Sequence, residues 1–190
     1  MILVDKVDIM GNKRLVLWLN LLALLLFLLF CCLFSTFAFW LRPTRQLVFE
    51  FDLKDLLLLI GAMLLILVVH ELIHGLFFKW FKPENKIKFG IKWKSGMAYA
   101  ISPGSLYSRR QMLVIGLAPF VFWTLVLSLL FAAHFISHPT YIGLVSLHAA
   151  GCAGDFYYVW LLLVKHGRGD ILAEDTATGL LIYRPSEGRD

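Results

Sequence analysis

Charged residues are scarce in this chain of 190 residues: Asp, Glu, Lys and Arg make up 16% of it, whereas 59% is hydrophobic. An ordinary soluble domain has about a quarter charged residues and about half apolar ones, so the composition excludes that class. The sequence also lacks internal repeats and low-complexity linkers, which excludes a solenoid or a string of domains. We therefore expect a single membrane domain over residues 1–190.

Cysteine is scarce too, and Cys31, Cys32 and Cys152 all fall within apolar runs. Such positions are typical of small packing residues rather than of disulfides. The net charge of +5 is not accompanied by any nucleic-acid motif or by alternating aromatic and basic residues. We therefore expect a lipid bilayer as partner and no nucleic acid, while the oligomeric state stays open.

Four apolar runs are long enough to span a bilayer, which needs about 20 residues per helix. The first run is about twice as long as the apolar part of a signal peptide, so we interpret it as a retained helix. The expected fold class is an all-α integral membrane protein with four transmembrane helices. The expected spans are residues 15–41, 56–78, 112–133 and 141–164.

The basic residues predict the orientation, because cytoplasmic loops hold the excess of Lys and Arg. Fifteen of the 18 lie in the N-terminal tail, in the connection between the second and third spans, and in the tail 165–190. The opposite side has only Arg42, Arg45 and Lys54. Both termini are therefore predicted to be cytoplasmic, in a multi-pass protein of the cell membrane.

The basic connection is predicted to contain a β-hairpin over residues 86–101. Its first strand is expected in KIKFGIKWK, where basic and apolar residues alternate at the period of a strand. Ser95–Gly96 provides the turn, and MAYAI is expected to form the second strand. One interpretation is a loop whose apolar side rests on the membrane while its lysines meet anionic lipid. Another is an exposed edge that pairs with an extended substrate, and the two are compatible. A second short hairpin is expected around Thr178–Gly179 in the tail.

A zinc site is predicted within the second apolar run, where HELIH occupies positions 70–74. An ionisable residue at membrane depth costs about 2.5–3.5 kcal/mol, so Glu71 indicates a functional site. H-E-x-x-H on a helix places both imidazoles on one face, where His70 and His74 can bind one Zn²⁺. Glu71 is then the predicted general base for the metal-bound water. The alternative is two packing histidines that hydrogen-bond to neighbouring groups.

A third ligand has to come from another helix, because a catalytic zinc ion needs three protein ligands and an open position. At 1.5 Å per residue, His70 and Asp155 both lie about 15 Å from the basic ends of their helices. This equal depth makes Asp155 the predicted third ligand. The alternatives left open are Cys152 and, if the tail folds back beneath the site, Asp170, Glu174 and Asp175.

His148 and Gly151 are predicted to line the site, because they lie two turns and one turn before Asp155 on the same helix face. Gly151, like the adjoining Gly154, would let the fourth helix approach the second closely. His148 is either a polar lining or proton-relay residue or a hydrogen-bonded packing residue. We expect His134, His138 and His166 at the membrane interface or in solvent.

Three motifs follow one another along the chain: HELIHG from His70, Leu117-Ala118-Pro119, and GCAGDFYYVW at 151–160. With them the chain resembles the putative zincin peptidases, small membrane proteins of prokaryotes, and more widely the site-2 protease class of intramembrane metalloproteases. The likeness extends from about Asp55 to Tyr183. It implies zinc-dependent hydrolysis of peptide bonds at membrane depth, with Glu71 as catalytic base and with zinc ligands at His70, His74 and Asp155.

The sequence thus predicts a membrane-embedded zinc metalloprotease acting on peptides or membrane proteins. A transmembrane substrate has to unwind before attack, and pairing with the hairpin would hold it extended. The alternative is a non-proteolytic zinc-binding protein, such as a sensor or an inactive relative that binds clients. A transporter or proton channel built on His70, His148 and Asp155 is disfavoured, because four unbroken helices without inverted halves are expected.

Overall fold

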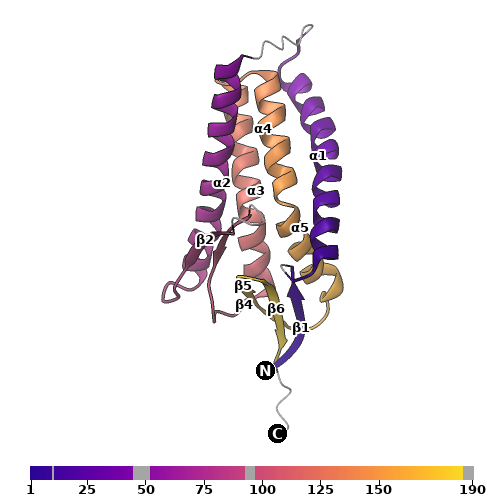
Figure 1. Ribbon diagram of the computed structural model, residues 1–190, viewed down its shortest axis with the longest axis vertical. Helices are drawn as coiled ribbons and strands as arrows, with labels where there is room; N and C mark the ends of the chain where they lie inside the picture. Colours follow the sequence, from indigo (N-terminus) through magenta and orange to yellow (C-terminus); the bar gives the residue numbers. More distant parts are fainter. Residues whose placement is uncertain (10, 45–51, 93–96, 186–190) are drawn as a thin grey trace. The chain divides into compact units, whose positions relative to one another are not determined.

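The computed structural model describes residues 1–9, 11–44, 52–92 and 97–185 (Figure 1). Several positions used above lie outside the described residues: Arg45 and Arg189, Trp93 and Lys94 of the hairpin, and its Ser95–Gly96 turn.

Three long helices correspond to the first three expected spans: α1 (Lys13–Leu41), α2 (Leu53–Phe81) and α3 (Arg109–Ala132). At 1.5 Å per residue, each is longer than the roughly 30 Å hydrocarbon core of a bilayer. All three are long and apolar enough to cross a membrane. Length and composition therefore support a membrane protein.

Each of these helices begins at a polar residue that caps it. Asn12, Asp52 and Ser108 each accept, through a side-chain oxygen, the backbone N–H of the residue three positions later, at 3.1, 2.8 and 3.4 Å. The first N–H groups of a helix have no partner within the helix, so these caps fix where the helices start.

The fourth span is broken, which corrects the expectation of one continuous helix over 141–164. α4 (His138–Gly151) ends one residue before α5 (Ala153–Trp160), and a short π-helix, η1 (Leu161–Lys165), follows. Glycine is a weak helix former, and Gly151 and Gly154 flank the break. The described residues contain three candidate spans, or four if the broken pair counts as one.

The chain forms two compact units, and each long helix contributes a segment to both. The second unit comprises Asn20–Val69 and Phe120–Ala153. The first unit contains the HELIH motif, all the described strands and the two ends of the chain. It comprises Met1–Leu19, His70–Pro119 and Gly154–Asp190.

The second unit is helical and has an aromatic core. Phe131 of α3 and Tyr141 of α4 are fully buried and stack with ring centroids 4.5 Å apart. Arg42 donates from Nη1 to the carbonyl oxygens of Phe131 and Ile136, at 2.8 and 3.1 Å, and its guanidinium lies over the Phe131 ring. One cation thus contacts two carbonyls, that of Phe131 in the last turn of α3 and that of Ile136 between α3 and α4.

The first unit contains a four-stranded antiparallel sheet in which β6 lies between β1 and β5 (Figure 1). Its order is β1 (Ile2–Asp8), β6 (Gly179–Arg184), β5 (Leu172–Thr176) and β4 (Tyr107–Ser108). One face of the sheet is apolar and joins the helices in a common core. The buried core residues are Val7, Ile9, Phe78, Tyr107, Met112, Ile115, Leu161, Leu162, Ile171, Ala173, Leu180 and Ile182.

The expected C-terminal hairpin is formed by β5 and β6, which pair from Leu172 with Tyr183 to Thr176 with Gly179. Gly179 has φ +152°, and a Cβ there would collide with the carbonyl oxygen of Val7, so only glycine fits. β1 and β4 are not part of the all-α expectation, because each finds its partner strand far away in the sequence. In the described part of the chain the fold is mostly helical, with two small antiparallel sheets.

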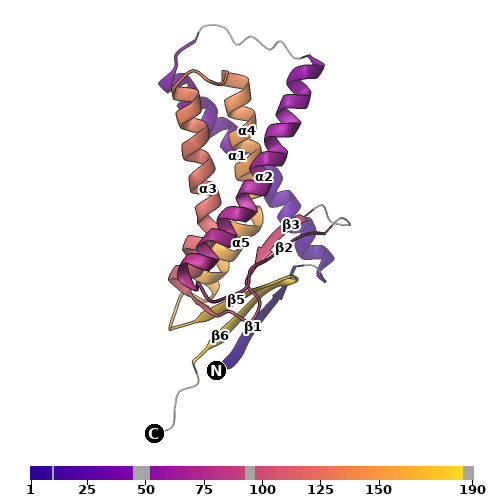
Figure 2. The same ribbon diagram turned by 90° about the vertical axis from the view of Figure 1, so that its left-hand side faces the viewer.

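β2 (Lys88–Lys92) and β3 (Met97–Ile101) form the hairpin predicted between the second and third spans. They pair antiparallel from Lys88 with Ile101 to Lys92 with Met97. Figure 2 shows this hairpin beside the last turns of α2. The location of the hairpin in the cytoplasm stays a prediction.

Asp5 joins the four-stranded sheet to the end of η1. Its Oδ2 accepts hydrogen bonds from Lys165 Nζ and His166 Nε2, each at 2.7 Å. His166, expected at the interface or in solvent, is buried, which corrects that expectation. Burial alone would raise the pKa of Asp5, but the hydrogen bonds from the two bases outweigh burial and lower this pKa below its ordinary value of 3.8.

Candidate metal centre

The two histidines of HELIH face each other across one turn of α2. Their Nε2 atoms are 3.1 Å apart, and their ring centroids are 4.7 Å apart. Residues four apart are neighbours on a helix surface, so the spacing of His70 and His74 in the sequence produces this arrangement. Both side chains are buried. Buried ring nitrogens need partners, and a shared ion is one way to supply them.

Asp155 approaches this pair from the first turn of α5. Its Oδ2 is 3.4 Å from Nε2 of His70, and its Oδ1 is 3.4 Å from Nε2 of His74. The three residues form a group whose candidate ligand atoms all lie within 4.8 Å of one another. The structure therefore brings together the three residues that were predicted as metal ligands.

The spacing of these atoms fits a tetrahedral zinc ion. With zinc–ligand bonds of about 2.0–2.2 Å, two ligands of a tetrahedron are separated by roughly 3.3–3.6 Å. The two Nε2 atoms are 3.1 Å apart, and each lies 3.4 Å from a different oxygen of Asp155, so these separations are close to that range. Two imidazoles and a carboxylate are also the donor set of one group of catalytic zinc sites, in which the fourth position stays open.

The ring of His74 is oriented by its other nitrogen. Nδ1 lies 2.9 Å from the backbone carbonyl oxygen of Ile115 in α3. A carbonyl only accepts hydrogen bonds, so Nδ1 carries a hydrogen and donates it. In a neutral ring the lone pair is then on Nε2, the atom that faces His70 and Asp155.

Glu71 is linked to the β2–β3 hairpin. Its carboxylate accepts a hydrogen bond from the backbone of Ala100 in β3. The hairpin is seated on α2 one residue beyond His74, where the Phe89 ring covers Gly75. Phe89 and Ala100 are cross-strand partners, so the contact at Gly75 and the contact at Glu71 support each other. The hairpin is thus docked on the helix that carries the predicted base.

A family model described as putative zincin peptidase matches residues 63–167. The chain belongs to the putative zincin peptidase family. The matched residues include the HELIH motif, the β2–β3 hairpin, α3 and the helix that carries Asp155. Comparisons with curated proteins and with solved structures gave no match.

In this member of the zincin peptidase family a cavity of about 40 Å³ adjoins the ligand group. It is lined by His74 and Asp155 together with Tyr158 and Asp175. Since one water molecule needs about 10–15 Å³ of such space, the cavity has room for about two to four. Burial raises the pKa of Asp175 to about 8; the charge of His74 opposes this shift, and the nearby carboxylates reinforce it.

Of the three acidic tail residues considered as alternative ligands, Asp175 alone lines this cavity. Glu174 is engaged elsewhere, because its Oε1 accepts the backbone N–H of Gly104 at 2.7 Å and its Oε2 accepts the hydroxyl of Tyr183 at 3.4 Å. Asp170 is exposed. Among the described residues of the first unit, the group that could hold an ion consists of His70, His74 and Asp155.

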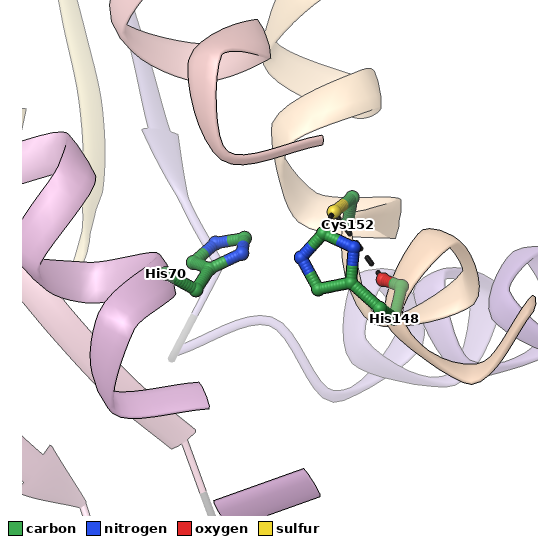
Figure 3. Close-up of side chains that lie close together, drawn as sticks. All are labelled: His70, His148 and Cys152. Carbon is green, nitrogen blue, oxygen red and sulfur yellow. Dashed lines mark hydrogen bonds between the residues drawn. The ribbon is translucent and has the colours of Figure 1, made fainter. Parts of the chain in front are cut away.

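The residues predicted to line the site, His148 and Gly151, lie in α4 of the second unit. His148 is buried, and the Cys152 sulfur lies 3.3 Å from its carbonyl oxygen and 3.8 Å from its Nε2 (Figure 3). His70, drawn in the same figure, belongs to the first unit. The lining role of His148 and Gly151 stays a prediction, as does Cys152 as a soft ligand.

Three groups of the site were not predicted. Tyr158 lies three residues after Asp155, so helical spacing could have indicated it. The carbonyl of Ile115 could have been found from Pro119, which cannot donate the hydrogen bond that a helix would give that carbonyl. No signal in the sequence marks the backbone of Ala100, because its position depends on how the hairpin docks.

Proposed function

We propose that this chain is a membrane-embedded zinc metallopeptidase that hydrolyses peptide bonds of membrane-associated or transmembrane substrates. One observation carries the proposal: the ligand atoms of His70, His74 and Asp155 are separated by distances that suit a tetrahedral zinc ion. Membership of the zincin peptidase family supports the reaction class. In this proposal the three residues hold the ion, and Glu71 is the general base.

The reaction needs a proton to move from water to the leaving amine. A bound zinc ion would lower the pKa of a water molecule towards about 7 and draw charge from the scissile carbonyl. The Glu71 carboxylate takes a proton from that water, whose oxygen bonds to the carbonyl carbon, and delivers the proton to the amide nitrogen as the C–N bond breaks. The hydrogen bond from Ala100 holds the carboxylate in place for both transfers.

The outer edge of β3 is the proposed binding place for an extended substrate. Successive residues of a strand direct their backbone groups to alternate sides, and Ala100 directs its N–H to Glu71 rather than to β2. Ala98 therefore presents its N–H and C=O on the same edge. Among the described residues, β3 pairs only with β2. A peptide added along this edge would be held unwound next to Glu71, as hydrolysis of a helix requires.

The proposed location is the cell membrane, with both termini in the cytoplasm. The first unit contains fifteen of the 18 Lys and Arg residues, whereas Arg42, Arg45 and Lys54 belong to the second. An excess of basic residues is typical of the cytoplasmic side. With this orientation, the exposed Lys86 and Lys88 of the hairpin region meet anionic lipid headgroups.

The test starts with the metal and then measures cleavage. The full chain is purified in detergent, its zinc content is determined, and cleavage of a model transmembrane helix is followed with and without a chelator. We expect about one zinc ion per chain and cleavage that the chelator abolishes. Glu71→Gln should keep the zinc and lose activity by about a hundredfold or more.

Each other result has a defined meaning. A purified protein without zinc, or a fully active Glu71→Gln variant, would contradict the proposal. Zinc binding without cleavage of any substrate would favour a non-proteolytic sensor or client-binding protein. The substrate itself is best found by cross-linking peptides to the inactive Glu71→Gln variant in membranes and identifying them by mass spectrometry.

A further inference from the structure

The hydrogen bond that orients His74 uses a carbonyl that an ordinary helix would not offer. In an α-helix each carbonyl accepts the N–H of the residue four positions later. For Ile115 that residue is Pro119, which has no N–H. α3 nevertheless continues unbroken from Arg109 to Ala132. The Ile115 carbonyl is thus left without its helical partner inside the protein.

The Ile115 carbonyl and the His74 ring contact each other in the protein interior. Ile115 is 2% exposed, and Pro119 is among the fully buried side chains. A buried carbonyl without a partner is costly, and so is a buried ring N–H. The 2.9 Å contact between Nδ1 of His74 and this carbonyl satisfies both groups at once. Water is not needed for either.

We propose that Pro119 is a positioning residue for the metal. Because Pro119 has no N–H, the Ile115 carbonyl can accept the hydrogen bond from Nδ1 of His74. This hydrogen bond orients the ring so that Nε2 faces the ion. The inference rests on the proposed function in that it takes His74 as a zinc ligand. Metal-binding histidines commonly donate their second N–H to a carbonyl or carboxylate, which fixes the tautomer and the ring orientation. Here the proline makes that acceptor available.

The main test variant is Pro119→Ala, which restores an N–H at the fourth position. The new donor competes with His74 for the Ile115 carbonyl, because it lies at the position that an α-helix would pair with it. Loss of such an outer partner typically weakens metal binding 10- to 100-fold. We therefore expect the zinc affinity of Pro119→Ala, measured against a chromophoric chelator in detergent, to fall by about 10- to 100-fold.

A second variant separates the missing N–H from the shape of the ring. Lactic acid placed at position 119 by nonsense suppression has the methyl side chain of alanine but an ester oxygen instead of the N–H. We expect this variant to keep zinc affinity within about threefold of the original protein. Pro139→Ala is the matched proline control, because Pro139 lies in the first turn of α4, where no helical N–H is required. It should leave zinc binding unchanged.

Nitrogen NMR of His74 gives a readout that does not depend on activity. In zinc-free protein, at a pH at which the His74 ring is neutral, the original protein and the lactic acid variant should carry the ring hydrogen on Nδ1, whereas Pro119→Ala should show a mixture of tautomers. Equal zinc affinity of Pro119→Ala and the original protein would overturn the inference. So would equal losses in the alanine and lactic acid variants, because the ring alone would then matter. If the original protein binds zinc but cleaves nothing, the proposed function fails while the inference stands.

Discussion

The ring of Phe89 in β2 covers Gly75 of α2 so closely that a Cβ at position 75 would meet its Cζ at 2.5 Å. Gly75 directly follows the second histidine of HELIH, and the strand that pairs with Phe89 contacts Glu71 through Ala100. The absence of a side chain at one helix position therefore lets the hairpin reach the predicted base.

Gly75→Ala is expected to loosen the hairpin without removing the metal. Phe89 is 52% exposed, so its ring can swing aside and the stability of the protein should change little. The backbone of Ala100 then holds Glu71 less firmly, and we expect cleavage to fall several-fold, as for a small displacement at an active site. Zinc affinity should stay the same. Rates and zinc affinity measured on one preparation test this expectation.

Gly61→Ala is the matched control, because Gly61 lies in the same helix and a Cβ there would meet nothing within 4 Å. It should retain full activity. If Gly75→Ala were as active as Gly61→Ala, the contact between the hairpin and α2 at Gly75 would not affect cleavage.

Zinc affinity should distinguish the two aspartates near the histidines. The two oxygens of Asp155 each lie 3.4 Å from Nε2 of one histidine, whereas Asp175 lines the adjoining cavity. We expect Asp155→Ala to weaken zinc binding by more than about a hundredfold, the upper end of the loss for an outer partner. Asp175→Ala should weaken it by less than about tenfold. The opposite order, measured by chelator competition, would make Asp175 the third ligand.

The raised pKa of Asp175 predicts how stability depends on pH. This pKa is about 8 in the folded protein and ordinarily 3.8. A carboxyl with a raised pKa is bound to its proton more tightly when folded, so its contribution to stability is complete below about pH 4 and is lost as pH rises through 8. In zinc-free protein, Tm should therefore fall more between pH 5 and pH 8 than it does in Asp175→Asn.

Asp170→Asn serves as the comparison, because Asp170 is an exposed carboxylate close to the same strand. Its Tm should follow the pH dependence of the original protein. A parallel fall of Tm in Asp175→Asn and the original protein would show that Asp175 does not carry this dependence.

Asp5→Asn should weaken the attachment of β1 to the end of η1. The substitution removes the charge that accepts hydrogen bonds from Lys165 and His166. Loss of a partner to a buried polar group costs about 1–3 kcal/mol, so the free energy of unfolding should fall by that amount at pH 7. Lys165 is 48% exposed, and Lys165→Ala should therefore cost less than Asp5→Asn.

The contribution of Asp5 to stability depends on pH with the opposite sign to that of Asp175. The pKa of Asp5 is lowered on folding, so its contribution is present above the ordinary value of 3.8 and is lost as pH falls below it. Chemical unfolding at pH 7 and at about pH 3 checks this. A difference between Asp5→Asn and the original protein that persists undiminished at the lower pH would contradict the expectation.

The parts of the fold that the sequence predicted depend on local patterns. Apolar runs indicated the long helices, alternation indicated the β2–β3 hairpin, and the i, i+4 spacing of His70 and His74 fixed their shared face. Asp155 could be placed beside them because depth along a helix follows from counting residues. Each of these inferences needs only a few neighbouring residues and a known period.

The parts that escaped prediction depend on contacts between distant segments. β1 alternates apolar and polar residues only weakly, and β6 provides its partner strand from the other end of the chain. The break at Cys152 is flanked by two glycines, which are weak helix formers, and not by a proline, so it had no strong signal in the sequence. The burial of His166 required a carboxylate from β1. None of these partners could be assigned before the topology was known.

The pairing of β1 with β6 also determines the order in which the chain can fold. Ribosomes make Ile2–Asp8 before α1, but its partner Gly179–Arg184 emerges only after all of the long apolar helices have been synthesised. Pairing between such distant segments is intrinsically slow. β5, which brings Asp175 to the cavity, is likewise made after α5. A newly synthesised chain therefore contains His70 and His74 before it contains Asp175, which lines the cavity beside His74. The surroundings of the metal centre are completed last.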